Sequence, residues 1–359
     1  MWLSRLEIEN IRNIERAELA PANGYNLITG SNGSGKSSLL EAIQCLSTGK
    51  SFRTLRKQPL IRSGAERAIV YGQLITQNSL FHLGLMKRLD GATLARIDGR
   101  NLEGQAELAT LLPVIGISPE SEDIVGDGSK ARQAYLDWTL FHVEPNFREC
   151  WRSYRRALFQ RNSALRGKLD TPTIKSWNAS LITLGEQLDH WRRNTFSRLH
   201  LLIEKILIEL LPESAISFSY RQGWPKELTL AQALESTLDV DRKMGFTHCG
   251  PHRADIAIRG PLGVIGHTLS RGQRKVTALS LKISQAQDYQ QQTGCEPVIY
   301  IDDLPSELDA ANRNKILQHL LKLNSQLFIT AISEADMPMR EYRPLALFHV
   351  EQGRVTNVV

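Results

Sequence analysis

The sequence predicts an α/β fold in which both ends of the chain form a nucleotide-binding lobe and a helical lobe is inserted between them. A glycine-rich phosphate-binding motif at residues 30–37 and two aspartates after an apolar segment at residues 298–301 support the first part of this prediction. Long segments of helical periodicity in the middle of the chain support the second. We expect the nucleotide-binding lobe to comprise residues 1–118 and 245–359, and the inserted arm to comprise residues 119–244.

The phosphate-binding motif, Gly30 to Ser37, has the form Gly-x-x-x-x-Gly-Lys-Ser. The apolar segment 25–28 before it predicts a strand, and residues 38–46 after it have the pattern of a helix. Glycines let backbone N–H groups turn toward phosphate oxygens, and the helix N-terminus adds partial positive charge. We expect Lys36 to reach the β- and γ-phosphates of ATP and the Ser37 hydroxyl to bind Mg²⁺. The other residues expected at the nucleotide are Gly30, Ser31, Asn32, Gly33, Ser34, Gly35 and Ser38.

The two aspartates near the other end of the chain supply the second part of the expected site. The apolar residues before Asp302 predict a buried parallel strand, and ligands of open α/β sheets gather at the carboxyl ends of such strands. We expect Asp302 to hold Mg²⁺ through water and Asp303 to orient or polarise the attacking water. The alternative is an acidic turn after a core strand, which the phosphate-binding motif in the same chain disfavours.

A third motif, Ser270-Arg271-Gly272-Gln273, precedes a long helical pattern over residues 274–289. Ser270 is a good helix N-cap, and Gly272 allows a phosphate to approach the backbone. By itself this motif is weak evidence, because serine caps are common. Its position between the phosphate-binding motif and the paired aspartates gives it weight.

The order of these motifs resembles that of the ABC-type ATPases, which implies an ABC-type P-loop ATPase lobe. In that family the motif at Ser270, Gly272 and Gln273 binds the γ-phosphate held by another copy, so the resemblance implies an ATP-dependent homodimer. The segment Ser306-Glu307-Leu308-Asp309 looks like the D-loop of that family, at the dimer interface. ABC transporters usually have a switch histidine after the next strand, where this chain offers only Ser333 as a substitute.

Further motifs resemble the SMC-like branch of these ATPases and, within it, the RecF family of DNA replication and repair proteins. Arg12 and Asn13 follow the first predicted strand, and in the SMC-like branch such a pair contacts the base and ribose of the nucleotide. The motifs similar to those of the RecF family are Ser118-Pro119-Glu120, Arg132 with Tyr135-Leu136-Asp137-Trp138, and Gly250-Pro251-His252-Arg253 between Thr247-His248 and Asp255. This similarity covers nearly the whole chain.

Two departures from the family pattern affect the expected chemistry. The SMC-like branch uses a glutamine to bridge Mg²⁺ and water, and only Gln73 and Gln105 are candidates for it here, by their distance in sequence. The catalytic acid of the wider superfamily is usually glutamate. Asp303 is shorter by one methylene, which favours slow hydrolysis.

The middle of the chain predicts a short antiparallel helical hairpin. Apolar residues alternate in steps of three and four over residues 147–169 and 177–210, and residues 170–173 have the composition of a tight turn. The first helix makes a rod of about 35 Å, so it is far shorter than the coiled coil of SMC proteins. Trp151 and Trp191 occupy seam positions and are expected in the hairpin core.

The first of these helices is rich in arginine. Arg148, Arg152, Arg155 and Arg156 are the residues that we expect to contact the DNA backbone, since the planar guanidinium binds two phosphate oxygens. The alternative is a solvated helix face. The whole chain has 44 Lys and Arg against 38 Asp and Glu, a net charge of +6 that permits a polyanionic partner without requiring one.

Composition and resemblance together favour a cytoplasmic protein. The chain has 42% hydrophobic residues, no C-x-x-C pair among its four cysteines, and no segment near about 18 consecutive apolar residues. The resemblance implies an ATP-dependent protein of recombinational repair that binds duplex or gapped DNA, hydrolyses ATP weakly, helps to load recombinase, and has RecR and RecO as partners. Two alternatives remain at this point, the ATPase subunit of a membrane transporter and a passive DNA clamp with a vestigial ATP site.

Overall fold

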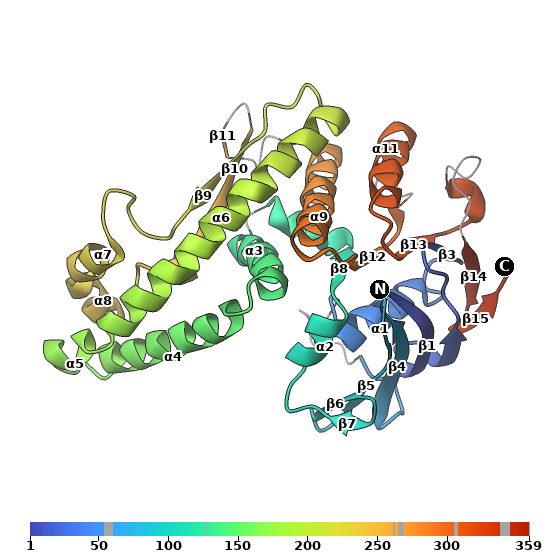
Figure 1. Ribbon diagram of the computed structural model, residues 1–359, viewed down its shortest axis with the longest axis horizontal. Coiled ribbons are helices and arrows are strands. Elements are labelled where there is room, and N and C mark those ends of the chain that lie inside the picture. Colours follow the sequence, from blue (N-terminus) through green and yellow to red (C-terminus); the bar gives the residue numbers. More distant parts are fainter. Residues whose placement is uncertain are drawn as a thin grey trace. The chain divides into compact units, whose positions relative to one another are not determined.

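The computed structural model divides the chain into two compact units, shown in Figure 1. The first unit comprises residues 1–122 and 271–359, and the second comprises residues 123–270. The structure describes residues 1–53, 60–126, 128–260, 263–264, 269–304, 308–337 and 345–358. The α/β fold with a lobe formed from both chain ends is therefore confirmed. The expected boundary at residue 245 is wrong, because residues 245–270 belong to the second unit.

A mostly parallel sheet carries the phosphate-binding loop at the end of one of its central strands. Its strand order is β15-β14-β3-β13-β12-β8, and only the β14–β15 pair is antiparallel. The buried strands β3 and β13 have no exposed residue, as the apolar segments at these positions predict. The strands are β3 (Tyr25–Thr29), β8 (Val114–Ile117), β12 (Val298–Ile301), β13 (Leu327–Ala331), β14 (Ala346–Glu351) and β15 (Arg354–Asn357).

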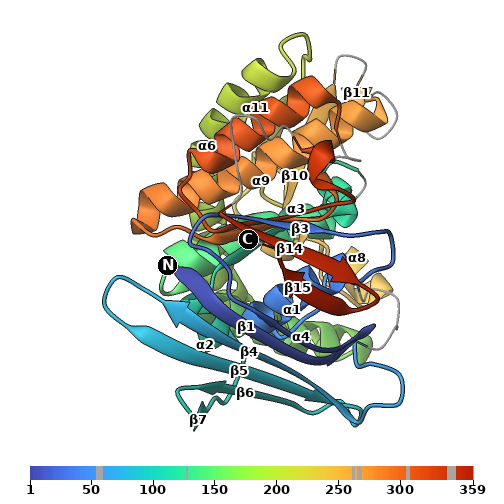
Figure 2. The same ribbon diagram turned by 90° about the vertical axis from the view of Figure 1, so that its right-hand side faces the viewer.

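A second, antiparallel sheet lies across helix α1 from the first sheet (Figure 2). Helix α1 (Lys36–Thr48) packs between the two sheets, and its buried residues Leu39, Leu40 and Ile43 belong to the main hydrophobic core of this unit. Helices α9 (Arg271–Thr293) and α11 (Ala310–Leu321) cover the other face of the parallel sheet in the same view. The remaining elements of this unit are β1 (Trp2–Ile11), β2 (Ile14–Leu19), β4 (Arg67–Ile75), β5 (Leu80–Arg88), β6 (Thr93–Ile97), β7 (Arg100–Asn101), α2 (Ala106–Leu111), α9 (Arg271–Thr293), α11 (Ala310–Leu321) and the 3₁₀ turn η4 (Glu334–Asp336); the 3₁₀ turn η1 (Pro119–Ile124) crosses into the second unit.

The second unit is built on two long helices that form a hairpin (Figure 1). Helices α4 (Phe147–Arg166) and α6 (Asn178–Leu210) confirm the predicted helical pair. Their connection is a short helix, α5 (Thr171–Lys175), instead of the expected tight turn, because Asp170 accepts a hydrogen bond from the Thr173 N–H and caps it. The other elements are α3 (Ser129–Val143), α7 (Leu230–Ser236), α8 (Leu238–Met244), the 3₁₀ turn η2 (Pro251–Arg253), and a sheet of β9 (Ser217–Arg221), β10 (Asp255–Gly260) and β11 (Gly263–Val264).

Pairing of β10 with β9 explains why residues 245–270 belong to the second unit. The two strands form an antiparallel ladder from Asp255 opposite Arg221 to Arg259 opposite Ser217. This ladder is a long-range contact that the local sequence does not encode. None of the described helices has the length and apolarity needed to cross a membrane.

The hairpin core contains both tryptophans that the periodicity placed there. Trp151 and Trp191 pack against a buried cluster that includes Phe147, Tyr154 and Leu188. The Trp151 ring stacks on Tyr154 with 5.8 Å between ring centroids. The prediction that these tryptophans belong to the core is confirmed.

Candidate nucleotide-binding site

The phosphate-binding loop connects β3 to α1 and requires glycine at its first position. Gly30 has φ +149°, and a Cβ there would lie 2.2 Å from the Val350 carbonyl oxygen. Any other residue at this position would be strained and would clash with the neighbouring strand β14. Gly33 and Gly35 also have positive φ, at +79° and +123°. The loop is thus a tightly wrapped turn that ends where α1 begins.

The Lys36 ammonium folds over this loop. Its Nζ donates to the carbonyl oxygens of Gly30, at 2.6 Å, and Ser31, at 3.0 Å. Burial lowers the pKa of Lys36, while the carboxylates of Asp303 and Asp302 act in the opposite direction. The lysine is therefore a buried cation held at the loop, where a phosphate group would be bound.

Asp302 is joined to the loop through Ser37. The Ser37 hydroxyl and the Thr330 hydroxyl both donate to Asp302 Oδ1, each at 2.9 Å. Burial raises the pKa of Asp302, and these two hydrogen bonds counteract the rise. Mg²⁺ binds hydroxyl and carboxylate oxygens and usually keeps several waters, so these residues fit an ion that Ser37 ligates directly and Asp302 holds through a bound water.

Asp303 has a strained backbone and is anchored by the same threonine. Its φ is +58°, which is uncommon outside glycine, and its N–H donates to Thr330 Oγ1 at 2.7 Å. Thr330 is fully buried at the end of β13, next to β12 in the parallel sheet. One hydroxyl thus fixes both site aspartates, one through its side chain and the other through its backbone.

Arg12 and Asn13 hold the site from the β1–β2 turn. The Arg12 guanidinium forms two hydrogen bonds, of 2.9 and 2.8 Å, to the buried Glu41 carboxylate on α1. Asn13 Nδ2 donates to the carbonyl oxygens of Gly33 and Ser34, and its Oδ1 accepts from the Ser38 hydroxyl. Both residues line the pocket described next, and their hydrogen bonds support the loop from outside.

A pocket with a free volume of about 760 Å³ lies over the loop. Arg12, Lys36 and Arg53 make its wall strongly cationic beside the paired aspartates, as suits a triphosphate with its metal ion. Gly30, Ser31 and Ser34 of the loop are not among the described lining residues, and the Ser34 hydroxyl lies on the side of Gly30, 2.8 Å from the position of a Cβ there. The described lining residues are Arg12, Asn13, Asn32, Gly33, Gly35, Lys36, Ser37, Ser38, Arg53, Pro119, Asp302 and Asp303.

Three residues of the site were missed by sequence reasoning. Thr330 is the one polar residue of the otherwise apolar strand β13, which is a signal that the sequence could have given. Pro119 lies two residues after β8, the neighbour of β12, so the strand order places it here. Arg53 gives no local signal. The two proposed glutamines are not among the described pocket-lining residues: Gln73 donates to the Tyr71 hydroxyl in the antiparallel sheet, and Gln105 lies against Gly49.

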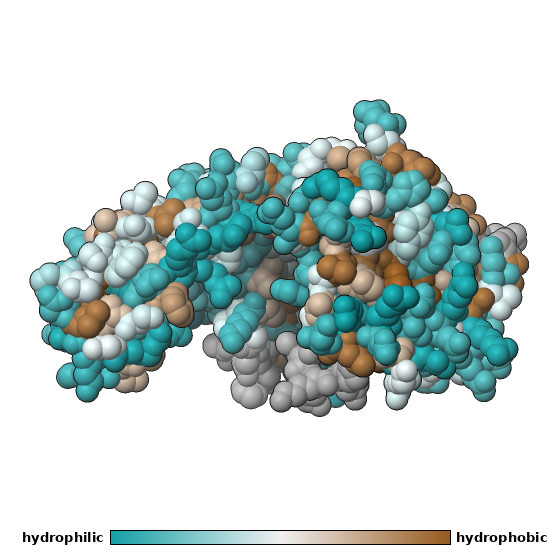
Figure 3. All heavy atoms as spheres, turned by 90° about the horizontal axis from the view of Figure 1, so that it is seen from below, coloured by the Kyte–Doolittle hydropathy of each residue, from teal (hydrophilic) through white to brown (hydrophobic). Residues whose placement is uncertain are grey.

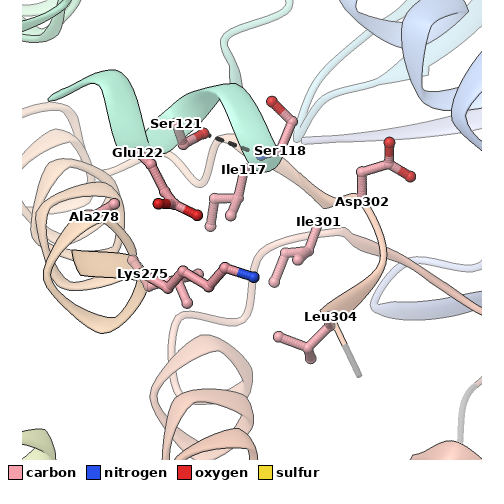
Figure 4. Close-up of a pocket in the computed structure, with 10 residues that line it drawn as sticks. Ile117, Ser118, Ser121, Glu122, Lys275, Ala278, Ile301, Asp302 and Leu304 are labelled. Atoms are coloured by element: carbon pink, nitrogen blue, oxygen red, sulfur yellow. Dashed lines mark hydrogen bonds between the residues drawn. The ribbon is translucent and has the colours of Figure 1, made fainter. Parts of the chain in front are cut away.

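A second pocket of the first unit lies on another side of the Asp302 strand (Figure 4). Ile117, Ile301 and Leu304 give it apolar walls, and the side chains of Glu122 and Lys275 extend into it. Lys275 lies in the first turns of α9, so the helix that begins at Arg271 borders the strand that carries Asp302.

The third motif lies at the start of α9. Ser270 immediately precedes the helix, at the boundary of the two units, while Gly272 and Gln273 lie in its first turn. Gly272 and Gln273 are not among the described residues that line the pocket over the loop. Of the expected D-loop, Ser306 lies outside the described residues.

Two further candidates from the sequence, Asp309 and Ser333, are N-caps of helical turns. The Asp309 side chain accepts a hydrogen bond from the Asn312 N–H and caps α11, and this bond lowers the pKa of Asp309. The Ser333 hydroxyl accepts from the Ala335 N–H and caps η4. Ser333 therefore caps a helical turn and is not among the described pocket-lining residues.

Most motif residues of the second unit form a buried polar framework. Arg132 forms hydrogen bonds of 2.7 and 3.0 Å to the Asp255 carboxylate, which tie α3 to β10. Arg192, which is fully buried, makes a similar pair with Asp137 and donates to the Pro251 carbonyl oxygen. These motifs therefore fix the helices of this unit to the segment that follows α8.

His252 is a half-buried part of that framework, whereas a residue that follows a Gly-Pro turn usually lies at the surface. Its Nε2–H donates to the Thr247 carbonyl oxygen, so its Nδ1 accepts from the Tyr154 hydroxyl at 2.7 Å. Burial lowers the pKa of His252 to about 4. Gly250 has φ +139°, and a Cβ there would lie 2.5 Å from the Tyr154 hydroxyl oxygen. The turn therefore requires glycine at this position.

The arginines expected at DNA lie on the outer face of α4. Arg148, Arg152, Arg155 and Arg156 are all exposed. Three of them, Arg148, Arg152 and Arg156, line a surface groove with Pro145, Glu149 and Ser153. The structure thus brings the arginines together on one surface of the second unit.

Comparisons with known proteins agree on one family. The RecF/RecN/SMC N terminal domain family matches residues 2–356. The DNA replication and repair protein RecF of Cronobacter sakazakii is 38% identical over 357 residues, which cover 99% of this chain and 100% of that protein. RecF of Shewanella denitrificans is 39% identical over 359 residues, with full coverage of both chains.

Solved structures give the same result for the fold. The structure of the recombination mediator protein RecF with ATP in the RecFOR pathway is 27% identical, has a TM-score of 0.87, and covers 100% of this chain and 98% of its own. The SMC head bound to the C-terminal winged-helix domain of ScpA is 15% identical with a TM-score of 0.60 and covers 100% of this chain and 98% of its own. The latter similarity concerns the fold alone.

Proposed function

The chain belongs to the RecF family of DNA replication and repair proteins, in the SMC-like branch of ABC-type ATPases, and on this basis we propose that it is an ATP-dependent DNA-binding protein of recombinational repair. ATP with Mg²⁺ is the proposed cofactor. The observation that carries this proposal is the Ser37–Asp302–Thr330 hydrogen-bond chain beside Lys36, because it joins the phosphate-binding loop to two acids in one pocket.

In this proposal different residues of the loop bind the phosphates and the metal ion. Lys36 exchanges its two loop carbonyls for the β- and γ-phosphates, and the Ser37 hydroxyl with the Asp302 carboxylate holds the metal ion. The metal neutralises charge on the phosphates. Asp303 orients and polarises the attacking water, and its short side chain keeps hydrolysis slow.

The pocket is completed by a second copy of the chain. Ser270, Gly272 and Gln273 of one copy close over the triphosphate held by the other, so ATP binding drives dimerisation and slow hydrolysis releases the dimer. The absence of Gly272 and Gln273 from the described lining of their own copy's pocket agrees with this arrangement. The exposed arginines of α4 hold the backbone of duplex or gapped DNA, in a sequence-independent and salt-dependent way.

The cellular context follows from the family. A related structure is described as a recombination mediator in the RecFOR pathway. We therefore infer that the protein acts in the cytoplasm with RecR and RecO, at single-strand gaps where recombinase is loaded.

Equilibrium sedimentation of the purified chain with and without ATP tests the proposal. Wild type is expected to shift from monomer to dimer with ATP, Lys36→Ala to remain monomeric, and Ser270→Arg to bind ATP as a monomer. A wild-type chain that stays monomeric with ATP and DNA would contradict it. Stimulation of hydrolysis by DNA is the second readout, because the ATPase subunit of a transporter would show none.

A further inference from the structure

One aromatic side chain stands apart from all others in the described part of the chain. Phe159 on α4 is 63% exposed, and no other phenylalanine, tyrosine or tryptophan among the described residues is exposed. The remaining aromatic residues of this helix, Phe147, Trp151 and Tyr154, lie in or against the hairpin core. The exposure of Phe159 is therefore a feature of one helix face and not of the whole helix.

That face is the basic one. With about 100° per residue, Arg148, Arg152, Arg155, Phe159 and Arg166 fall within an arc of about 60° on α4. All five are exposed, whereas the buried residues of the helix lie on other sides. We call these five residues the α4 stripe. Phe159 is thus flanked along the helix by arginines on both sides.

The stripe has the dimensions of a nucleic-acid contact. Arg148 and Arg166 are separated by about 27 Å along the helix at about 1.5 Å per residue, which matches about eight base steps of 3.4 Å. Figure 3 shows the face of the second unit on which α4 lies; it is mainly hydrophilic, with only scattered hydrophobic residues. An aromatic ring set between phosphate-binding arginines is the arrangement by which proteins hold unpaired bases, since every base has a face on which a ring can stack.

We propose that Phe159 stacks on an unpaired base at the junction between duplex and single-stranded DNA, while the arginines of the α4 stripe hold the adjoining backbone. This inference rests on the proposed DNA contact of α4 and adds to it the residue that meets the unpaired base of gapped DNA. In an intact duplex the bases are stacked on each other, so the ring has no base face to contact. At a gap the first unpaired base is available, and the ring gains a partner there.

Binding of blunt and gapped duplexes of equal length and sequence, measured by fluorescence anisotropy at fixed salt, tests the inference. Phe159→Ala is expected to weaken gapped-DNA binding about tenfold and blunt-duplex binding less than about twofold. Phe159→Tyr keeps a ring and is expected to bind like wild type, whereas Phe159→Leu keeps an apolar side chain and is expected to resemble the alanine variant. Leu201→Ala, at an apolar residue of α6 that is 69% exposed, is the matched control and leaves both affinities unchanged.

A 2-aminopurine probe at the first unpaired position gives a second readout. Its fluorescence is expected to change when wild type binds and to change less when Phe159→Ala binds at saturation. An equal loss of affinity for both DNAs, or an unchanged ratio of the two affinities in Phe159→Ala, would overturn the inference. The inference is also overturned if Phe159→Ala loses binding to a protein partner while its affinity for both DNAs is unchanged.

Failure of the underlying DNA contact has a different signature. Arg152→Gln combined with Arg155→Gln is expected to weaken binding to both DNAs and to reduce the salt slope by about two, because two phosphate contacts are lost. If this double variant binds both DNAs like wild type, α4 is not the DNA surface, and the inference falls with it. If only the double variant has an effect, the DNA contact stands and the stacking inference fails.

Discussion

Replacing Thr330 with valine removes one hydroxyl that fixes both site aspartates while keeping the volume of the side chain. The Asp303 N–H, now 2.7 Å from that hydroxyl, loses its acceptor, and Asp302 Oδ1 keeps only the Ser37 hydroxyl as a donor. Thr330 is fully buried, so water does not replace it easily. Leaving such a group unsatisfied costs about 1–3 kcal/mol, and we expect the free energy of unfolding to fall by this amount.

The effect on hydrolysis should exceed the effect on binding. Lys36 and the loop are untouched in Thr330→Val, so nucleotide affinity is expected to stay near that of wild type. Asp303 loses the contact that holds its strained backbone, and we expect hydrolysis to slow at least about tenfold, equivalent to about 1.4 kcal/mol of transition-state stabilisation.

Three measurements check this prediction: steady-state ATP hydrolysis, affinity for a fluorescent ATP analogue, and urea unfolding. Thr139→Val is the matched control, since Thr139 is also fully buried but lies on α3 in the second unit and bonds within its own helix. Wild-type hydrolysis by Thr330→Val would refute the positioning role of this hydroxyl. A loss of hydrolysis in Thr139→Val of the same size would show that the effect is only general destabilisation.

Further predictions concern the catalytic acid and the framework of the second unit. Asp303→Asn is expected to slow hydrolysis while ATP-dependent dimers persist in sedimentation; dimers that dissociate at the wild-type rate would contradict this. Gly250→Ala is expected to lower the urea midpoint, because the added Cβ meets the Tyr154 hydroxyl and the backbone has a positive φ. Gly91→Ala is the control for backbone strain alone, since Gly91 also has a positive φ but no atom lies within 4 Å of the added Cβ. Equal midpoints for the two variants would refute the clash. The pKa of His252 is about 4 in the folded protein and about 6.5 in the unfolded chain, so its contribution to the free energy of unfolding is present in full above about pH 6.5. This contribution is lost as the pH falls toward 4, by up to about 1.4 kcal/mol per pH unit. His252→Gln should flatten the pH dependence of the free energy of unfolding between about pH 4 and 6.5, and an unchanged slope would contradict this.

The nucleotide-binding loop and the acid-bearing strand were predictable because their signals are local. The glycine spacing specifies a turn that only glycines accommodate, and four apolar residues before Asp302 specify a buried strand. Helices α4 and α6 followed from periodicity, which depends only on the residues of each segment.

The features that escaped prediction depend on tertiary contacts. Thr330 and Pro119 reach the site because β13 and β8 lie on either side of β12. The sequence of a single strand does not predict which strands become its neighbours. His252 follows Gly-Pro, which is typical of a surface turn, but the Tyr154 hydroxyl, 98 residues away in the sequence, hydrogen-bonds to its ring. The boundary near residue 245 was misplaced because β10 pairs with β9, and this pairing places the residues after 245 in the second unit.

The central claim is that two copies share each ATP, and mixing two inactive variants tests it most directly. Lys36→Ala lacks a working loop and Ser270→Arg lacks a working partner motif, so each alone is expected to hydrolyse almost no ATP. Because neither variant dimerises by itself, the dimers of an equal mixture are heterodimers in which one of the two sites has an intact loop opposite an intact Ser270, which predicts recovery of at most about half of wild-type activity for a two-fold symmetric pair. Absence of any recovery, together with wild-type hydrolysis by monomeric Ser270→Arg, would contradict the claim.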